Sequence, residues 1–241
     1  MSRTAAVVPA AGRGERLGPG APKALRHLGG VPMLVHAVRA LASAHSVDLV
    51  VVAAPAEGVA DVEQLLAEHG LMDAAGGRAA SIVVAGGDTR QASVARALLV
   101  LPTDIDVVLV HDAARPLVPT SLVDAVATAV RSGADAVVPG LPVADTVKAV
   151  DLHGVVEATL DRAVLRAIQT PQGFRRAMLT AAHAAADPDA PATDDAGLVE
   201  AIGGRVVVVP GDDEAFKVTR PLDLVLAEAV LARRRAAGVV A

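Results

Sequence analysis

Apolar residues occur along this chain in two alternating patterns. Short apolar runs occupy residues 4–9, 47–54, 81–85, 106–110, 135–139 and 205–209, and such runs are typical of strands buried on both faces of a parallel sheet. The segments between them carry apolar residues at helical spacing. They predict amphipathic helices over residues 32–44, 57–70, 120–131 and 221–236, and two more that end near residues 101 and 186. This alternation indicates an α/β fold with a doubly wound, mostly parallel sheet flanked by helices.

The pattern changes between residues 141 and 165, where polar and apolar residues alternate around the turn sequence Asp151-Leu152-His153-Gly154. The alternation predicts a β-hairpin that projects from the α/β body. A two-stranded ribbon is only marginally stable alone, so we expect this arm to pack against a second copy of itself in a homodimer. Two further strands are expected over residues 166–174 and 215–219. No second apolar core and no linker is evident, and we expect one domain over residues 1–241.

The loop after the first strand has the composition of an anion-binding turn. Residues 10–23 contain four glycines and the cations Arg13, Arg16 and Lys23. Glycine lets successive backbone N–H groups approach a phosphate, and the cations neutralise its charge. The loop does not match the dinucleotide fingerprint, because its third glycine comes one residue late. It does not match the P-loop either, because Lys23 is not preceded by glycine. We therefore expect the loop itself to wrap around a polyphosphate.

Polar groups also follow two later strands. Gly86-Gly87 leads through Asp88 into a helix that contains Ser93, and Asp112 comes directly after the strand at residues 106–110. The carboxyl ends of parallel strands meet at one edge of an open sheet, where such folds bind their ligands. An aspartate at this position can hold a metal ion or a ribose hydroxyl, which makes Asp112 the leading candidate carboxylate.

Composition narrows the classes of function. The formal net charge of −5 provides no basic field for nucleic acid. The absence of cysteine excludes disulfides, thiolate catalysis and Cys-ligated zinc. No uncharged apolar segment approaches the ~18 residues that cross a bilayer, and the N-terminus lacks the apolar region of a signal peptide. We expect a cytoplasmic protein that does not associate with membranes.

Seven motifs, taken together and in order, resemble one family over essentially the whole chain. They are Ala10-Ala11-Gly12…Arg16…Pro22-Lys23, Gly86-Gly87-x-x-Arg90-x-x-Ser93-Val94, Asp112-Ala113-Ala114-Arg115-Pro116, Asp161-Arg162, Thr170-Pro171-Gln172, Thr193-Asp194-Asp195 and Lys217-Val218-Thr219. They are similar to those of the 2-C-methyl-D-erythritol 4-phosphate cytidylyltransferases of the non-mevalonate isoprenoid pathway. The resemblance implies a Rossmann-like three-layer nucleotidyltransferase (GT-A-like) fold. It also implies transfer of CMP from CTP to 2-C-methyl-D-erythritol 4-phosphate, which gives 4-diphosphocytidyl-2-C-methyl-D-erythritol and pyrophosphate, with Mg²⁺ or another divalent cation as cofactor.

The same resemblance assigns roles to individual residues. The catalytic residues would be Arg16, Lys23 and Lys217. The nucleotide would be bound by Ala10, Ala11, Gly12, Gly87, Asp88, Ser93, Asp112 and Ala113, with Asp112 also the candidate metal ligand. The acceptor would be bound by Arg115, Thr170, Thr193 and Lys217, together with Thr146 and Arg162 of the partner subunit's arm. Thr193 is in addition the expected N-cap of a helix that begins with two acids.

Several alternatives stay open. A ribitol-5-phosphate cytidylyltransferase would use the same loop with a different acceptor pocket. A dinucleotide-binding dehydrogenase would need an acidic residue at the end of its second strand, but Asp48 precedes Val50-Val51-Val52 here. A non-catalytic nucleotide-binding protein would not need both Arg16 and Lys23 beside a second anion site. The chain also departs from the resembled family at Ala24-Leu25, where Gln and an aromatic residue commonly follow the lysine.

Overall fold

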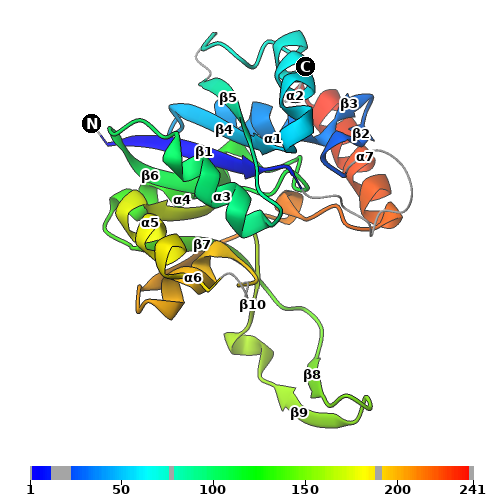
Figure 1. The fold of residues 1–241 in the computed structure, drawn as a ribbon. Helices are drawn as coiled ribbons and strands as arrows, with labels where there is room; N and C mark the ends of the chain where they lie inside the picture. The colour runs from blue at the N-terminus through cyan, green and yellow to red at the C-terminus, as the bar shows by residue number, and fades with distance from the viewer. Residues whose placement is uncertain (1, 12–22, 76–78, 188–191, 239–241) are drawn as a thin grey trace.

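A mixed sheet lies at the centre of the molecule and carries helices on its two faces (Figure 1). The computed structural model describes residues 2–11, 23–75, 79–187 and 192–238. Within these residues the sheet has eight strands. They are β1 (Arg3–Pro9), β4 (Leu49–Ala54), β5 (Ala80–Ala85), β6 (Ile105–Val110), β7 (Ala136–Pro142), β10 (Arg166–Ile168), β11 (Gln172–Arg175) and β12 (Val206–Pro210).

Most neighbouring strands of the sheet run parallel to each other. β5, β4, β1 and β6 are neighbours in that order, and all run in the same direction. β11 lies antiparallel between β6 and β7, while β12 runs parallel to β7. β10 pairs antiparallel with the end of β7. The predicted mostly parallel sheet is confirmed, and the carboxyl ends of β1, β4, β5 and β6 meet at one edge.

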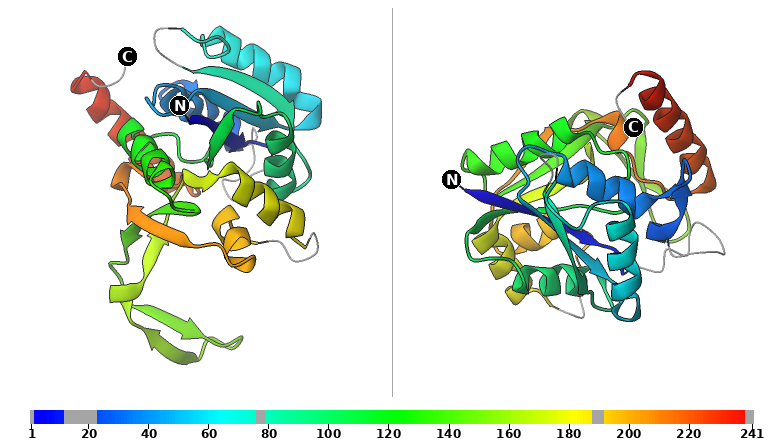
Figure 2. Two further views of the ribbon diagram at one scale, coloured as in Figure 1. Left: turned by 90° about the vertical axis from the view of Figure 1, so that its left-hand side faces the viewer. Right: turned by 90° about the horizontal axis from the view of Figure 1, so that it is seen from above.

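Helices cover both faces of the sheet, as two views at right angles show (Figure 2). One face carries α1 (Met33–Ala42), α2 (Val59–Glu68) and α4 (Thr120–Arg131). The other carries α3 (Arg90–Leu99), α5 (Arg176–Ala185) and α6 (Asp195–Ala201). The helix, sheet and helix layers agree with the predicted three-layer architecture.

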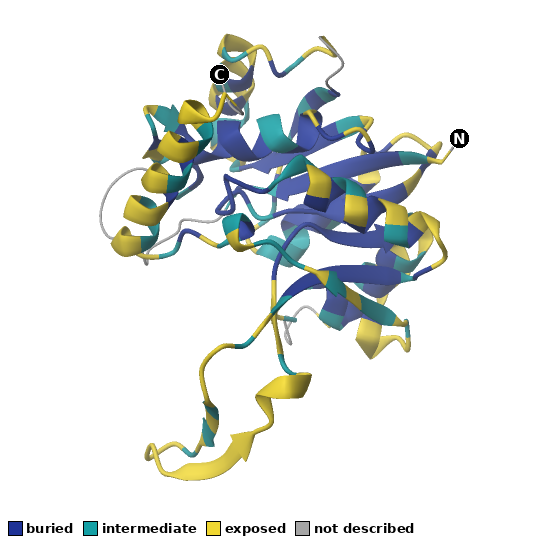
Figure 3. Ribbon diagram, turned by 180° about the vertical axis from the view of Figure 1, so that it is seen from behind, coloured by how far each residue is buried: buried dark blue, intermediate teal, exposed yellow. Residues whose placement is uncertain are grey.

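The core follows from the alternation of side chains along each strand. In β1, Ala6 and Val8 pack in the cluster that includes α1, α2 and α4, whereas Ala5 and Val7 pack in the cluster that includes α3, α5 and α6. All four side chains are fully buried, and the strands form the buried centre seen in Figure 3. A central strand therefore needs an unbroken run of apolar residues, because its side chains pack into the core on both faces of the sheet.

The closing helix α7 (Pro221–Ala236) packs against a separate small cluster. Leu231 of α7 meets Leu28, Met33, Leu117 and Val218 there. Leu28 belongs to a short ribbon of β2 (His27–Leu28) and β3 (Val31–Pro32). This cluster ties the C-terminal segment to the beginning of the chain and to the loop after β6.

The predicted hairpin is present and projects from the body as an arm (Figures 1 and 3). It consists of β8 (Val147–Val150) paired antiparallel with β9 (Val156–Leu160), followed by the 3-10 helix η4 (Arg162–Val164). The whole of β9 is exposed. The exposed residues of the arm include several large apolar ones, namely Val150, Leu152, Val155, Val156, Leu160 and Val164.

Three local expectations differ from the structure. Residues 215–219 are not a strand: after the 3-10 helix η5 (Asp213–Ala215), the Val218 N–H donates to the Ala114 carbonyl at 2.8 Å, in the loop after β6. The strand expected over residues 166–174 is interrupted between β10 and β11, at Pro171, which has no N–H to continue a ladder.

The third difference is the N-cap of α6, which is Asp194 and not Thr193. The Asp194 carboxylate accepts the Gly197 N–H at 2.9 Å, and its other oxygen accepts from the Gln172 side chain at 2.7 Å. Asp194 thus caps the helix and anchors it to β11 at the same time. None of the described helices is long and apolar enough to span a membrane.

Candidate active site

One pocket gathers most of the predicted nucleotide-binding residues. It lies where β1 and β6 end and where α3 begins, and Lys217 reaches it from the segment after η5. Its lining includes the predicted Ala10, Ala11, Lys23, Gly87, Asp88, Ser93, Asp112, Ala113 and Lys217, and in addition Thr89 and Arg90. Arg16 and Gly12 lie outside the described residues. Segments far apart in the sequence therefore meet at the sheet edge where a ligand was expected.

The turn after β5 is shaped by its two glycines. A Cβ on Gly87 would lie 2.5 Å from the Ala92 Cβ, and one on Gly86 would lie 2.9 Å from the Ser93 hydroxyl. Only glycine lets this turn lie so close to the first turn of α3. The Ser93 hydroxyl accepts the Gly87 N–H at 3.1 Å and lies 2.9 Å from the Thr89 carbonyl. Ser93 thus fixes the turn, and its predicted contact with the nucleotide stays a prediction.

Lys23 stands at the start of the 3-10 helix η2 (Lys23–Leu25). Ala24 is buried in the core cluster beneath α1, and Leu25 packs against the same cluster. The aliphatic pair that departs from the family pattern therefore anchors the segment that carries the lysine, and Lys23 lines the pocket.

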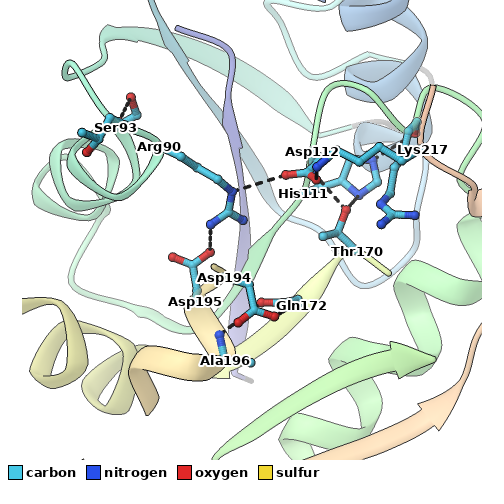
Figure 4. Close-up of polar contacts among 12 residues, drawn as sticks. Arg90, Ser93, His111, Asp112, Thr170, Gln172, Asp194, Asp195, Ala196 and Lys217 are labelled. Atoms are coloured by element: carbon cyan, nitrogen blue, oxygen red, sulfur yellow. Dashed lines mark hydrogen bonds and ion pairs between the residues drawn. The ribbon is translucent and has the colours of Figure 1, made fainter. Parts of the chain in front are cut away.

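Asp112 lies between two cations (Figure 4). One carboxylate oxygen is 2.7 Å from the Lys217 Nζ, and the other is 3.4 Å from the Arg90 Nε. Burial alone would raise the pKa of Asp112, but the charges of Arg90 and Lys217 outweigh it and hold that pKa well below its usual range. Asp112 is therefore ionised at neutral pH, the form that accepts hydrogen bonds from hydroxyl groups most strongly and that coordinates metal ions.

The backbone of Asp112 is fixed by a buried hydrogen-bond chain. Its N–H donates to the Thr170 hydroxyl at 3.1 Å, and that hydroxyl lies 3.1 Å from the His111 Nδ1. The His111 Nε2 lies 3.1 Å from the Arg115 carbonyl. Because a carbonyl only accepts, Nε2 carries the proton and the Thr170 hydroxyl donates to Nδ1. Burial lowers the pKa of His111 to about 4, which keeps it neutral.

The predicted acceptor-binding residues are less closely grouped. The buried Arg115 guanidinium donates to the backbone carbonyls of Ala215 at 2.7 Å and Ile168 at 3.3 Å. Thr193 is exposed before α6, and Thr146 and Arg162 are exposed on the arm. Arg162 donates to the Ala144 carbonyl within the arm. Apart from Lys217, the predicted acceptor-binding residues are outside the lining of this pocket, and their roles stay predictions.

A second layer of charge lies behind Asp112. The Arg90 Nη1 is 2.6 Å from Asp195, which is also 2.9 Å from the His183 Nε2. Arg90 and Asp195 belong to the sequence motifs but have no role predicted from them, and His183 belongs to none of those motifs. Arg90 is the first residue of a helix that follows a glycine turn, and this position is the sequence feature that could have indicated a role in the pocket. Nothing local indicated that His183 would face the same site.

The described residues would suit a magnesium ion that takes most of its ligands from a bound phosphate compound and water. Among the described residues, no three His, Cys, Asp or Glu side chains cluster as a metal site. Mg²⁺ in nucleotide enzymes typically takes one or two carboxylates and completes its shell with phosphates and water. The ionised Asp112 in the pocket would supply such a carboxylate.

Comparison with known proteins leads to one family. The family model for 2-C-methyl-D-erythritol 4-phosphate cytidylyltransferase matches residues 4–233. A protein of that name from Streptomyces avermitilis is 62% identical over 97% of this chain and 94% of its own length. The one from Frankia casuarinae is 59% identical over 96% of this chain and 82% of its own.

Solved structures agree with this match. The 2-C-methyl-D-erythritol 4-phosphate cytidylyltransferase of Thermus thermophilus superposes with a TM-score of 0.73 at 39% identity, over 97% of this chain and 100% of its own. The 4-diphosphocytidyl-2C-methyl-D-erythritol synthase of Anaerococcus prevotii gives 0.80 at 26%, over 96% and 99%. With the sequence motifs, the fold and the relatives in agreement, this chain belongs to the 2-C-methyl-D-erythritol 4-phosphate cytidylyltransferase family.

Proposed function

We propose that this protein transfers a cytidylyl group from CTP to 2-C-methyl-D-erythritol 4-phosphate and releases pyrophosphate, in the synthesis of isoprenoid precursors. The observation that carries the proposal is the pocket in which Lys23, Lys217 and Asp112 meet the Gly87 turn. Cations and carboxylates beside the backbone of this turn suit a triphosphate, a ribose and an anionic acceptor. The proposal treats residues 1–241 as one catalytic domain that acts in the cytoplasm.

The chemistry needs positioning and charge more than it needs a base. A phosphate oxygen of the acceptor is already anionic, and it attacks the α-phosphorus of CTP in line with the bond to the β-phosphate. The new P–O bond forms as the old one breaks, and the bonding pair leaves with pyrophosphate. Lys23 and Arg16 stabilise the charge that builds on the phosphates, and Lys217 orients the acceptor.

Base and sugar recognition would fall to the pocket walls. We expect Ala10, Ala11 and Gly87 to present backbone groups to cytosine, and Asp88 and Asp112 to lie near the ribose. A wall of glycine and alanine backbone, held in place by Ser93, would fit a pyrimidine closely and exclude the larger purines.

Asp112 would hold Mg²⁺ together with the triphosphate of CTP. The ion would neutralise charge on the phosphates when bound. The double contact of Asp112 with Lys217 and Arg90 keeps its carboxylate ionised and in place before any ion arrives.

The projecting arm supports a shared site in a homodimer. Its apolar side chains are exposed in the single chain, and Thr146 and Arg162 lie on it, away from the pocket of their own subunit. Docking against a second copy would bury the apolar side chains and bring these two polar residues to the neighbour's acceptor.

Pyrophosphate release tests the proposal directly. The four common nucleoside triphosphates are each supplied with 2-C-methyl-D-erythritol 4-phosphate or with ribitol 5-phosphate, with and without Mg²⁺. We expect release only with CTP, methylerythritol phosphate and Mg²⁺. Preference for ribitol phosphate would support the sister activity, and binding of CTP without turnover of either acceptor would support a nucleotide sensor.

A further inference from the structure

Arg90 joins the pocket to a buried charge behind it. It is the first residue of α3 and lines the pocket beside Asp112. Its Nε faces Asp112 at 3.4 Å, and its Nη1 is 2.6 Å from Asp195, so one planar guanidinium spans two carboxylates (Figure 4). Arginine can bridge in this way because its donors form a rigid fork, which lysine lacks.

Asp195 is a fixed anchor and has no access to substrate. Its side chain is 1% exposed, and the only residues it pairs with among those described are Arg90 and His183. Burial would raise the pKa of Asp195, but its bonds to His183 and Arg90 outweigh that effect and lower it. A buried carboxylate persists as a charge only where such partners neutralise it. Asp195 therefore holds the Arg90 guanidinium in one orientation.

The anchor is itself held by the sheet. Gln172 of β11 donates to the Asp194 carboxylate at 2.7 Å and accepts the Ala196 N–H at 3.2 Å. These bonds clamp the residues on either side of Asp195 at the start of α6 (Figure 4). The path from β11 through Asp195 to Arg90 consists of short bonds between buried or partly buried groups.

We infer that Arg90 is a positioning residue, held in place by Asp195 and His183. It sets the orientation of the Asp112 carboxylate, and through it the positive charge that Lys217 presents to the substrate. Arg90 occupies the oxygen of Asp112 that Lys217 does not. Without Arg90, the full negative charge of Asp112 would fall on Lys217, which would then attract an anionic acceptor less strongly. This inference rests on the proposed function.

A double-mutant cycle with Arg90→Gln and Asp112→Asn tests it. Arg90→Gln should raise the KM for the acceptor phosphate by roughly tenfold or more, the scale seen when an outer partner of a functional side chain is removed elsewhere. Arg90→Lys should recover only part of this loss, because it keeps the charge without the fork. In the Asp112→Asn background, Arg90→Gln should have little further effect, since the group that it positions is gone.

Other outcomes would overturn the inference. If Arg90 contacts the nucleotide directly, or only holds α3 to α6, its substitution will have the same effect in the wild-type background as in the Asp112→Asn background. Asp195→Asn keeps the shape of the anchor and removes its charge, so it should weaken acceptor binding in the same direction as Arg90→Gln. If Asp112→Asn is too slow to assay, the same cycle is run on acceptor binding by calorimetry.

Two controls separate this inference from the proposed function. Arg175→Gln removes a partly exposed arginine that contacts Asp135, outside the pocket lining, and it should leave all kinetic constants unchanged. Melting temperatures report whether each variant folds. An inactive wild-type protein would defeat the proposed function, whereas an active wild type with an unchanged Arg90→Gln variant would defeat only the role of Arg90.

Discussion

Asp112 illustrates how single side chains share charge in this pocket. Its carboxylate pairs closely with Lys217, at 2.7 Å, and more loosely with Arg90, at 3.4 Å. The lysine side chain remains 39% exposed, so substrate can reach it. A lysine held beside a carboxylate is pre-oriented, and its remaining charge is directed toward the pocket.

The buried His111 gives a prediction about pH. Burial lowers its pKa from 6.5 to about 4, so the unfolded chain takes up a proton at a higher pH than the folded chain. Stability from the neutral ring is therefore fully present above about pH 6.5 and is lost as the pH falls toward about 4. At pH 5 the loss relative to pH 7 should be about 2 kcal/mol.

The variant His111→Gln isolates this effect, because glutamine offers an N–H to the Arg115 carbonyl and does not titrate. We expect the free energy of unfolding, measured by denaturant titration, to fall less between pH 7 and pH 5 in the variant than in the wild type. Equal losses in both proteins would contradict a neutral, buried His111.

At the scale of elements, α4 lies directly on β11 over Gly173. A Cβ added at Gly173 would come within 2.6 Å of the Val126 Cγ1 and 2.9 Å of the Val130 Cγ2. The glycine lets α4 pack closely against β11. The first residue of this strand, Gln172, bonds to the start of α6. This contact helps set the height of one helix layer above the sheet.

Gly173→Ala should therefore destabilise the fold by about 1–3 kcal/mol through overpacking. The matched control is Gly58→Ala, where the new Cβ would have only ordinary contacts with Pro55, at 3.8 Å and beyond. We expect thermal melting to show a clear decrease for Gly173→Ala and a smaller change for the control. Similar shifts in both would show that the close packing over β11 carries no special cost.

Much of the element order could be predicted from the sequence because it depends on local patterns. The buried strands, the helix stripes and the glycine turns all have short-range signatures, and Asp112 follows its strand directly. The bond between Arg90 and Asp195 joins residues 105 positions apart, and no local pattern specifies it. The same is true of the bond from Thr170 to His111, which depends on where the antiparallel strand enters the sheet.

Residues 215–219 show a different limit of local patterns. Phe216 and Val218 alternate with polar residues as in a strand, yet the Val218 N–H is taken by the Ala114 carbonyl. Val218 is fully buried in the cluster beneath α7. Tertiary packing outweighed the strand pattern here, and the result is that Lys217 faces Asp112.

At the scale of the whole molecule, the proposed shared site predicts complementation between subunits. Lys23→Ala should lower turnover by about 100-fold or more, the cost of removing a preorganised group that stabilises the transition state. Arg162→Ala should impair acceptor binding in the neighbouring site. Mixed dimers of the two variants contain one site with both residues intact, and they should regain part of the wild-type rate of pyrophosphate release.

The control is each variant alone, measured at the same total concentration after the same unfolding and mixing procedure. Heterodimers are confirmed with two affinity tags of different kinds. Confirmed heterodimers without regained activity would contradict a site shared through the arm.

The interrupted strand of β10 and β11 joins the arm to the site. It pairs with the root of the arm at β7, passes Thr170 beside the Asp112 N–H, and places Gln172 against the start of α6. In the proposed homodimer, a partner docked on the arm and a nucleotide bound in the pocket would both act on this one stretch of backbone. Coupling of this kind is reciprocal: any factor by which subunit association tightens nucleotide binding is also the factor by which nucleotide tightens association. The concentration of the protein itself would then act as an effector of its own catalysis.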